Sequence, residues 1–386
     1  MPITQVTIKN YKSLENLILK MNPFMVFIGP NNAGKSNIFD CFWFLSDFVK
    51  RRDDSQSAVR ERGGFEQIVF NGDYIGRTIS LEFHGSIKVK EKERCYKYFI
   101  ELEGDRWGTC RNKRETFSLV EDGEKVLLEF PTEQSKGVAY DETGKQTGDI
   151  WAGRDRPYLS QFSDQDHYPI LGHFWHDVQD WAFFNLLPPL MRKSLPVRKE
   201  LQLQHLGENL PVVLHGLQSE SPQKFKEIED LLRTAIPELE ELTTALTSHE
   251  PGQTYIRIRE KGLTVSIPAW GMSDGTLRVL GHLATLYLPS LPPLVCFEEP
   301  ENYVHPRLLE LIVELLKNAS HKTQVLVTTH SPYLVDLLQP EDLFIVEKQD
   351  GKTQVKKAED KKGIKEALKT LGLGEMWYSG SLGGVP

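Results

Sequence analysis

A glycine-rich segment near the start of the chain constrains the fold most strongly. Residues 29–36 read Gly-Pro-Asn-Asn-Ala-Gly-Lys-Ser, which fits the pattern GxxxxGK[ST]. A short apolar run, residues 25–28, comes directly before it, and a helical pattern over residues 33–49 follows. A buried strand that leads through such a loop into a helix forms a phosphate cradle, because backbone N–H groups point at the anion. We therefore expect an α/β nucleotide-binding fold of the P-loop type.

The loop predicts how ATP and Mg²⁺ are held. Lys35 is expected to neutralise the β- and γ-phosphate oxygens, and the Ser36 hydroxyl is expected to bind Mg²⁺. Asparagine tolerates left-handed backbone angles, which suits residues 31 and 32. The residues that we expect around the nucleotide are Gly29, Asn31, Asn32, Ala33, Gly34, Lys35, Ser36 and Asn37.

Two glutamates end a later apolar run, residues 294–297. In a parallel sheet, the carboxyl end of that strand lies at the same edge as the P-loop. Glu298 is expected to hold Mg²⁺, directly or through water, and Glu299 to polarise the water that attacks the γ-phosphate. Taken alone, an apolar run that ends in two glutamates also fits a solvated strand end. The interpretation as a metal and catalytic site therefore depends on the order of this run among the other motifs.

Two further motifs fit a nucleotide site. His330 ends the next predicted strand, residues 323–329, where an imidazole could contact the γ-phosphate and the attacking water. Ser273 and Gly275 precede a helix whose N-terminus could bind a second anion; an ordinary helix cap is the alternative. Because one nucleotide needs one P-loop, a second anion site suggests that two subunits face each other.

The remaining pattern divides the chain into three parts. Residues 1–156 are expected to form an N-terminal ATPase half with an antiparallel β lobe, in which residues 135–156 form a loop. Residues 157–250 predict an inserted helical lobe. In residues 251–386, helices and strands alternate from residue 275 to residue 347, which predicts a largely parallel sheet.

Composition excludes several classes of protein. Of the 386 residues, 39% are hydrophobic, too many for a disordered chain, and no apolar run reaches the ~18 residues of a membrane helix. No export signal is apparent, so we expect a cytoplasmic protein with reduced cysteines. The 46 basic and 54 acidic residues give a net charge of −8, yet residues 88–114 and 348–369 are locally basic, which leaves nucleic-acid binding open.

The order of these motifs resembles that of the ABC-type ATPases of the SMC, RecF and OLD (overcoming lysogenization defect) group, over nearly the whole chain. The shared motifs are Asn-Tyr-Lys-Ser-Leu at residues 10–14, the P-loop, Ser-Asp-Gly-Thr, Glu-Glu-Pro-Glu and Thr-His-Ser-Pro. The resemblance implies an ABC ATPase head that forms a homodimer or higher oligomer around ATP. It implies that Ser273 and Gly275 act in trans as the signature motif, that His330 is the switch histidine, and that Asn302 lies in the D-loop.

This group also uses a glutamine that senses the γ-phosphate and the metal. Gln161 is the best match, with Gln67 as its rival. Glu298 departs from the usual aspartate by one methylene group, and no heptad pattern predicts a coiled coil.

The resemblance implies an ATPase that controls a separate effector protein, often in bacterial antiphage systems. A DNA-binding repair or loading ATPase of RecF type, and an ATP-stabilised scaffold with little turnover, are the alternatives. OLD nucleases continue into a Toprim domain, whereas this sequence ends soon after its last predicted strand, so we expect no nuclease activity.

Overall fold

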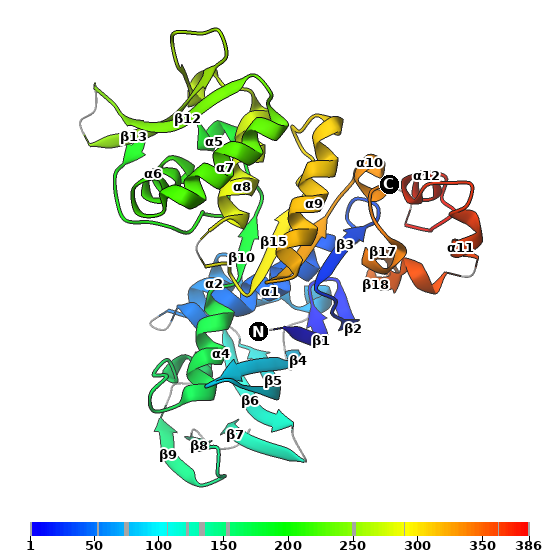
Figure 1. The fold of residues 1–386 in the computed structure, drawn as a ribbon. Helices are drawn as coiled ribbons and strands as arrows, with labels where there is room; N and C mark the ends of the chain where they lie inside the picture. Colours follow the sequence, from blue (N-terminus) through cyan, green and yellow to red (C-terminus); the bar gives the residue numbers. More distant parts are fainter. Residues whose placement is uncertain are drawn as a thin grey trace.

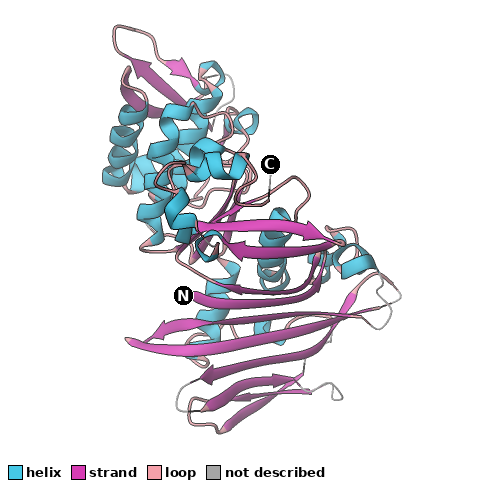
Figure 2. Cartoon of the chain, turned by 90° about the vertical axis from the view of Figure 1, so that its right-hand side faces the viewer, coloured by secondary structure: helices cyan, strands magenta, loops and turns pink. Residues whose placement is uncertain are grey.

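The chain contains two large β-sheets with helices packed on them (Figures 1 and 2). The computed structural model describes residues 2–384, except residues 52–53, 73–76, 106, 121–122, 131–135, 152–154, 249–251, 289 and 362. Within these described residues, no helix is both long enough and apolar enough to cross a membrane.

The first sheet is antiparallel and has the strand order β2-β1-β4-β5-β6-β7-β8-β9. Its strands are β1 (Ile3–Tyr11), β2 (Leu14–Lys20), β4 (Thr78–Val89), β5 (Lys92–Gly104), β6 (Cys110–Val120), β7 (Glu124–Phe130), β8 (Lys136–Tyr140) and β9 (Gln146–Trp151). Buried residues alternate with more exposed ones along β4 and β5, since only one face of such a strand contacts the core. This sheet confirms the predicted antiparallel β segments, but β8 and β9 occupy part of the predicted loop 135–156, so that part of the prediction was wrong.

The second sheet carries the P-loop and has the order β10-β15-β16-β3-β17-β18. Its strands are β3 (Phe24–Ile28), β10 (Ala182–Phe184), β15 (Leu294–Glu298), β16 (Gln324–Thr328), β17 (Leu343–Gln349) and β18 (Lys352–Lys357). All neighbours are parallel except β17 and β18. Strands β3 and β16 are apolar over most of their length because both of their faces are buried.

A third, smaller sheet lies at the end of the molecule opposite β4–β9 (Figure 1). It consists of β11 (Leu195–Pro196), β12 (Leu239–Leu246), β13 (Gln253–Glu260) and β14 (Ile267–Pro268). The long antiparallel partner of β13 is β12, and β14 pairs with the other side of β13 through Ile267 and Pro268.

The helices vary widely in length. The α-helices are α1 (Lys35–Lys50), α2 (Gln56–Arg60), α3 (Phe65–Ile68), α4 (Pro169–Gln179), α5 (Pro188–Met191), α6 (Leu210–Glu220), α7 (Pro222–Ala235), α8 (Asp274–Leu286), α9 (Leu309–Ser320), α10 (Pro332–Val335), α11 (Ile364–Ala367) and α12 (Leu373–Tyr378). Short 3₁₀ turns are η1 (Phe70–Gly72), η2 (Tyr158–Gln161), η3 (Ala269–Gly271), η4 (Pro306–Leu308), η5 (Pro340–Asp342) and η6 (Ala358–Asp360).

Two hydrophobic cores lie on opposite faces of the second sheet. Met25 and Phe27 of β3 belong to the core shared with α1, α4 and the first sheet. Val26 and Ile28 belong to the core shared with α6–α9. Because successive side chains of a strand point to opposite faces, β3 joins the two cores and holds the P-loop between them.

The predicted central segment, residues 157–250, contributes to both cores. Its helix α4 packs against α1 and β4, whereas α6 and α7 pack with α8. The division into residues 1–156, 157–250 and 251–386 therefore stays a prediction.

Candidate nucleotide-binding site

The backbone of the P-loop is fitted closely to its neighbours. Gly29 (φ 150°), Asn32 (φ 64°) and Gly34 (φ 108°) have positive φ angles. A Cβ atom at Gly29 would lie 2.0 Å from the carbonyl oxygen of Val346, and one at Gly34 would lie 2.1 Å from Oγ1 of Thr353. Glycine is needed at both positions because a side chain would meet both unfavourable backbone angles and neighbouring atoms.

Lys35 provides a buried positive charge at the start of α1. Its Nζ donates to the carbonyl oxygens of Gly29 (2.7 Å) and Pro30 (3.0 Å). Burial lowers the pKa of Lys35 to about 8, and the negative charge of Glu299 partly opposes this shift. Both hydrogen-bond partners found among the described residues are uncharged carbonyls. The site therefore fits an added anion such as phosphate, which would stabilise the charged ammonium.

Glu298 stands at the end of β15, in register with Thr328 of β16. Its carboxylate lies beside the Ser36 hydroxyl and accepts from Nδ2 of Asn185 (3.2 Å). Burial raises the pKa of Glu298, and the charge of Glu299 adds to this effect, while His205, Ser36 and Asn185 oppose it. A hydroxyl beside a partly buried carboxylate is a donor set that Mg²⁺ accepts, so the residues fit a magnesium ion.

Glu299 is held in a left-handed backbone conformation with φ 44°. Its N–H donates to the carbonyl oxygen of Thr328 (2.9 Å), and Nδ2 of Asn302 donates to its Oε2 (2.6 Å). Oε1 lies 3.9 Å from Nε2 of His330. A non-glycine residue at positive φ is strained, so these contacts fix the Glu299 side chain at a cost to the backbone.

A third carboxylate positions His330. Oε1 of Glu301 accepts from Oγ1 of Thr329 (2.7 Å) and from the His330 N–H (2.9 Å). Burial raises the pKa of Glu301. Burial and the charge of Lys35 lower the pKa of His330, so its imidazole is neutral near pH 7.

Arg278 ties helix α8 to the acidic strand end. Its side chain is 1% exposed, and its guanidinium donates to the carbonyl oxygens of Glu298 (3.2 Å), Glu299 (2.5 Å) and Leu186. From its place one turn into the helix that follows Ser273, Arg278 could either contact phosphate or lie on the surface. Its burial rules out the surface position, and its hydrogen bonds to backbone carbonyls give it a positioning role that the sequence did not predict.

The predicted second anion site lies at the start of α8. Oγ of Ser273 caps the helix by accepting from the N–H of Thr276 (3.0 Å). A Cβ atom at Gly275 would lie 2.8 Å from the carbonyl oxygen of Tyr303. This helix end opens on a hollow of about 480 Å³ whose lining includes Ser273, Gly275 and Tyr303 but no residue of the P-loop.

The structure brings together five of the predicted side chains, those of Lys35, Ser36, Glu298, Glu299 and His330. Their catalytic and metal-binding roles stay predictions. Within the P-loop, Asn31 and Asn32 are exposed, while Ala33 is buried.

Two predicted amide residues are placed differently. Nδ2 of Asn37 donates to Oγ of Ser13 (2.7 Å). Gln161 is exposed at the end of η2, and among the described residues no hydrogen bond joins it to the P-loop; Gln67 is also exposed. The role of Gln161 stays a prediction. The amide that does contact the site, Asn185, was missed because strand β10 before it has only three residues, too few for a detectable pattern.

Comparisons with known proteins agree with this geometry. The profile of the family AAA_21, described as "AAA domain, putative AbiEii toxin, Type IV TA system", matches residues 24–336. An OLD nuclease of Thermus scotoductus is 22% identical over 96% of this chain. The DNA replication and repair protein RecF of Corynebacterium jeikeium is 34% identical over 64 residues, or 16% of this chain. The chain spans 67% of the length of the OLD nuclease and 15% of that of RecF.

Solved structures with the same fold are Smc heads. A Smc head bound to the C-winged helix domain of ScpA has a TM-score of 0.57 at 13% identity, covering 96% of this chain and 100% of that one. A Smc head with an extended coiled coil, bound to the C-terminal domain of ScpA from Pyrococcus furiosus, has a TM-score of 0.50 at 11% identity, covering 95% and 99%. These likenesses confirm the predicted α/β ATPase-head fold.

Proposed function

Because the chain belongs to this AAA-domain family, within the SMC, RecF and OLD group of ATPases, we propose that it binds ATP with Mg²⁺, closes as a homodimer around ATP and hydrolyses it. The observation that carries this proposal is the convergence of Lys35, Ser36, Glu298, Glu299 and His330 at one edge of the second sheet. Each of these side chains has the chemistry that one step of phosphoryl transfer needs.

Substrate binding is the task of the loop and α1. The ammonium of Lys35 and the N–H groups of the loop would hold the β- and γ-phosphates, and the negative charge would raise the pKa of Lys35 toward its ordinary range. Ser36 and Glu298 would hold Mg²⁺, with Asn185 fixing the second carboxylate oxygen. Bound Mg²⁺ would neutralise charge that develops on the phosphate oxygens.

Water activation is the task of Glu299. Its carboxylate would orient a water molecule and accept its proton, while Asn302 and the backbone contact to Thr328 hold that carboxylate in place. The neutral imidazole of His330, 3.9 Å away, could donate a hydrogen bond to the γ-phosphate. Arg278 would keep the backbone of both glutamates fixed during the reaction.

A second copy of the chain would complete the site. Ser273 and the N-terminus of α8, a helix of 13 residues, open on a hollow that contains no residue of the same chain's P-loop. The positive end of the helix dipole favours an anion there. We propose that this surface covers the γ-phosphate held by the partner copy.

The decisive experiment compares three variants with the wild type by light scattering and by phosphate release. Glu299→Gln should bind ATP, lose turnover and accumulate as a dimer, whereas Lys35→Ala should bind no ATP and stay monomeric. Glu314→Gln, an exposed carboxylate of α9, is the matched control and should behave as wild type. Monomeric Glu299→Gln with bound ATP, beside a wild type with normal turnover, would refute the dimer.

We further propose that dimer closure controls a separate effector protein in bacterial defence against phage. The family description names a toxin–antitoxin system, which supports a chain that acts with a partner. Plaque counts should rise when the chain, expressed with the products of its adjacent genes, carries Lys35→Ala. Plaque counts equal to those of wild type would contradict this role. If phosphate release in wild type is as slow as in Glu299→Gln, the chain is instead an ATP-stabilised scaffold.

A repair-type function is the second candidate, and the match to RecF favours it. It predicts salt-sensitive DNA binding through residues 88–114. Several charges there are already paired, including Lys88 with Glu91 (2.6 Å) and Lys97 with Glu82 (3.4 Å). Absence of DNA binding at low salt would eliminate this candidate.

A further inference from the structure

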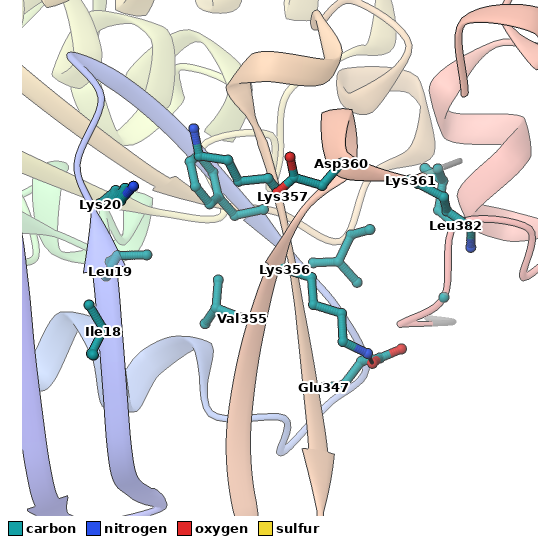
Figure 3. A pocket seen from close by; sticks show the side chains of 13 residues that line it. Ile18, Leu19, Lys20, Glu347, Val355, Lys356, Lys357, Asp360, Lys361 and Leu382 are labelled. Carbon is teal, nitrogen blue, oxygen red and sulfur yellow. Dashed lines mark hydrogen bonds and ion pairs between the residues drawn. The ribbon is translucent and has the colours of Figure 1, made fainter. Parts of the chain in front are cut away.

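A groove of about 710 Å³ lies against β17, the neighbour of the P-loop strand β3, and the proposed ATPase reaction does not use it. Its two walls are β2 and β18, which are the edge strands of the first and second sheets. Figure 3 shows Ile18, Leu19 and Lys20 on one wall, with Val355, Lys356 and Lys357 on the other.

The two edge strands are joined at one end only. The N–H of Thr353 donates to the carbonyl oxygen of Ser13 (2.8 Å), and Lys352 pairs with Glu15 (2.7 Å). Beyond that end, no strand pairing connects β2 with β18 among the residues that the structure describes. Edge strands present unpaired N–H and C=O groups, which can bind an extended segment of another chain.

Both walls repeat the same side-chain order. An apolar residue is followed two positions later by a lysine, as Ile18 and Lys20 on β2, and as Val355 and Lys357 on β18. Residues two apart on a strand share a face. Ile18 is 61% exposed although it is a large aliphatic residue, and the ammonium of Lys357 lies 5.6 Å from the ring centre of Phe344. The groove therefore alternates apolar and cationic positions.

The groove carries positive charge on an acidic chain. Its lining contains four lysines and two carboxylates, Glu347 and Asp360, whereas the whole chain has a net charge of −8. Lys20 and Lys361 have no ion-pair partner in the described part of the chain, whereas Lys357 pairs with the exposed carboxylate of Glu359 (3.0 Å) outside the groove lining. Glu347 is already occupied, because it pairs with Lys356 (2.8 Å) and accepts from the N–H of Gly384 (3.0 Å). Negative charge is thus the complement that this surface lacks.

We propose that this groove binds an extended acidic segment of a partner protein, in which an apolar side chain alternates with a carboxylate. The apolar side chains would pack between Ile18 and Val355. One carboxylate would pair with Lys20, and another would replace the exposed Glu359 at Lys357. One free strand edge would supply backbone hydrogen bonds to the segment.

Strand β18, one wall of the groove, contacts the P-loop through the side chain of Thr353. Oγ1 of Thr353, on β18, donates to the carbonyl oxygen of Ala33 (2.8 Å) and lies 2.7 Å from Oγ of Ser13. Ser13 in turn accepts from Asn37 of α1 (2.7 Å). A partner that shifts β18 would therefore move a direct contact of the P-loop. This coupling rests on the proposed nucleotide function, and by linkage ATP would change the partner's affinity by the same factor.

Binding is tested with fluorescein-labelled peptides and fluorescence anisotropy. The probe alternates valine with aspartate, and its counterpart alternates valine with lysine. The acidic probe should bind the wild type, and its affinity should fall as salt is raised. Lys20→Glu combined with Lys357→Glu should weaken binding about tenfold or more, because two attractive pairs become repulsive. Ile18→Ser should also weaken it, at an exposed position where folding is little affected.

Lys193→Glu combined with Lys322→Glu, two exposed lysines elsewhere, is the matched control and should bind as wild type. Equal binding of both peptides, or no binding of the acidic one, would overturn the proposal. The proposal would also be overturned if a single-stranded DNA oligonucleotide displaced the peptide and its binding were lost in Lys20→Glu combined with Lys357→Glu. A wild type whose self-association is abolished by Ile18→Ser would identify a second copy of the chain as the occupant and would also overturn it.

The coupling has a separate readout. ATP should change the affinity for the acidic peptide in wild type but not in Thr353→Val, while Thr353→Ser, which keeps the hydroxyl, should retain the effect. An ATP effect that survives in Thr353→Val would overturn the coupling. If the protein binds the acidic peptide but no ATP, the proposal for the groove stands and the proposed ATPase function is refuted.

Discussion

Replacing Lys35 with methionine tests the electrostatics of the P-loop directly. The substitution keeps a long unbranched side chain but removes a cation that is 6% exposed and is bonded to two carbonyl oxygens. Burial lowers the pKa of Lys35 from its ordinary value of 10.5 to about 8. Charged Lys35 therefore destabilises the folded protein at neutral pH by about 3 kcal/mol, since one pH unit corresponds to about 1.4 kcal/mol.

The sign of the pH dependence follows from the two pKa values. Between about pH 8 and pH 10.5, the unfolded chain binds more protons at Lys35 than the folded protein does. The free energy of unfolding of the wild type therefore increases as the pH rises through this window. The contribution of Lys35 to this increase is absent in Lys35→Met. Between pH 7 and pH 9.5, the wild type should gain about 2 kcal/mol relative to the variant.

Urea unfolding curves of both proteins at several pH values measure this difference. Lys50→Met, at the last residue of the same helix, is the control and should show no such change. Adding ATP with Mg²⁺ at pH 7 should stabilise the wild type and Lys50→Met, but not Lys35→Met. If the difference in unfolding free energy between wild type and Lys35→Met stayed constant from pH 7 to pH 9.5, burial would not lower the pKa of Lys35. The argument for an anion at this site would then fail.

Three further substitutions test the surrounding contacts. Arg278→Met removes three hydrogen bonds to buried carbonyls, so it should destabilise the protein by about 2–4 kcal/mol in urea unfolding and slow phosphate release; unchanged stability would contradict its positioning role. Asn185→Ala removes the hydrogen bond to one oxygen of Glu298, so ATP binding should need about tenfold more Mg²⁺ in a magnesium titration. An unaltered titration would show that Asn185 does not position Glu298 for the metal. The buried carboxylate of Glu115 in β6 accepts from Tyr98 and Leu159 at one oxygen and from Asn112 and Tyr158 at the other. Glu115→Gln turns an amide N–H₂ toward one of these two pairs of donors, so it should cost about 2–4 kcal/mol of unfolding free energy without changing ATP affinity. A loss of ATP affinity at equal stability would refute this purely structural role.

The sequence determined the parts of the site that depend on local pattern. The apolar run of β3 and the glycines of the P-loop specify a strand, a tight loop and a helix in sequence order, because their backbone angles and burial are local properties. The strand that ends in Glu298 was likewise predicted at residues 294–298, where the structure has it. Parallel pairing of β3, β16 and β15 then brings residues that are far apart in the sequence to one sheet edge.

Only the tertiary structure decided which other side chains reach that edge. Asn185 follows a strand of three residues, and Arg278 lies on a helix face like many others, so neither carries a sequence signal for its contact. The groove between β2 and β18 cannot be detected in the sequence, because its walls belong to different sheets and are joined by long-range contacts, those of Ser13 with Thr353 and of Glu15 with Lys352. Long-range packing determines these contacts. The P-loop can be recognised from the sequence because its residues are consecutive.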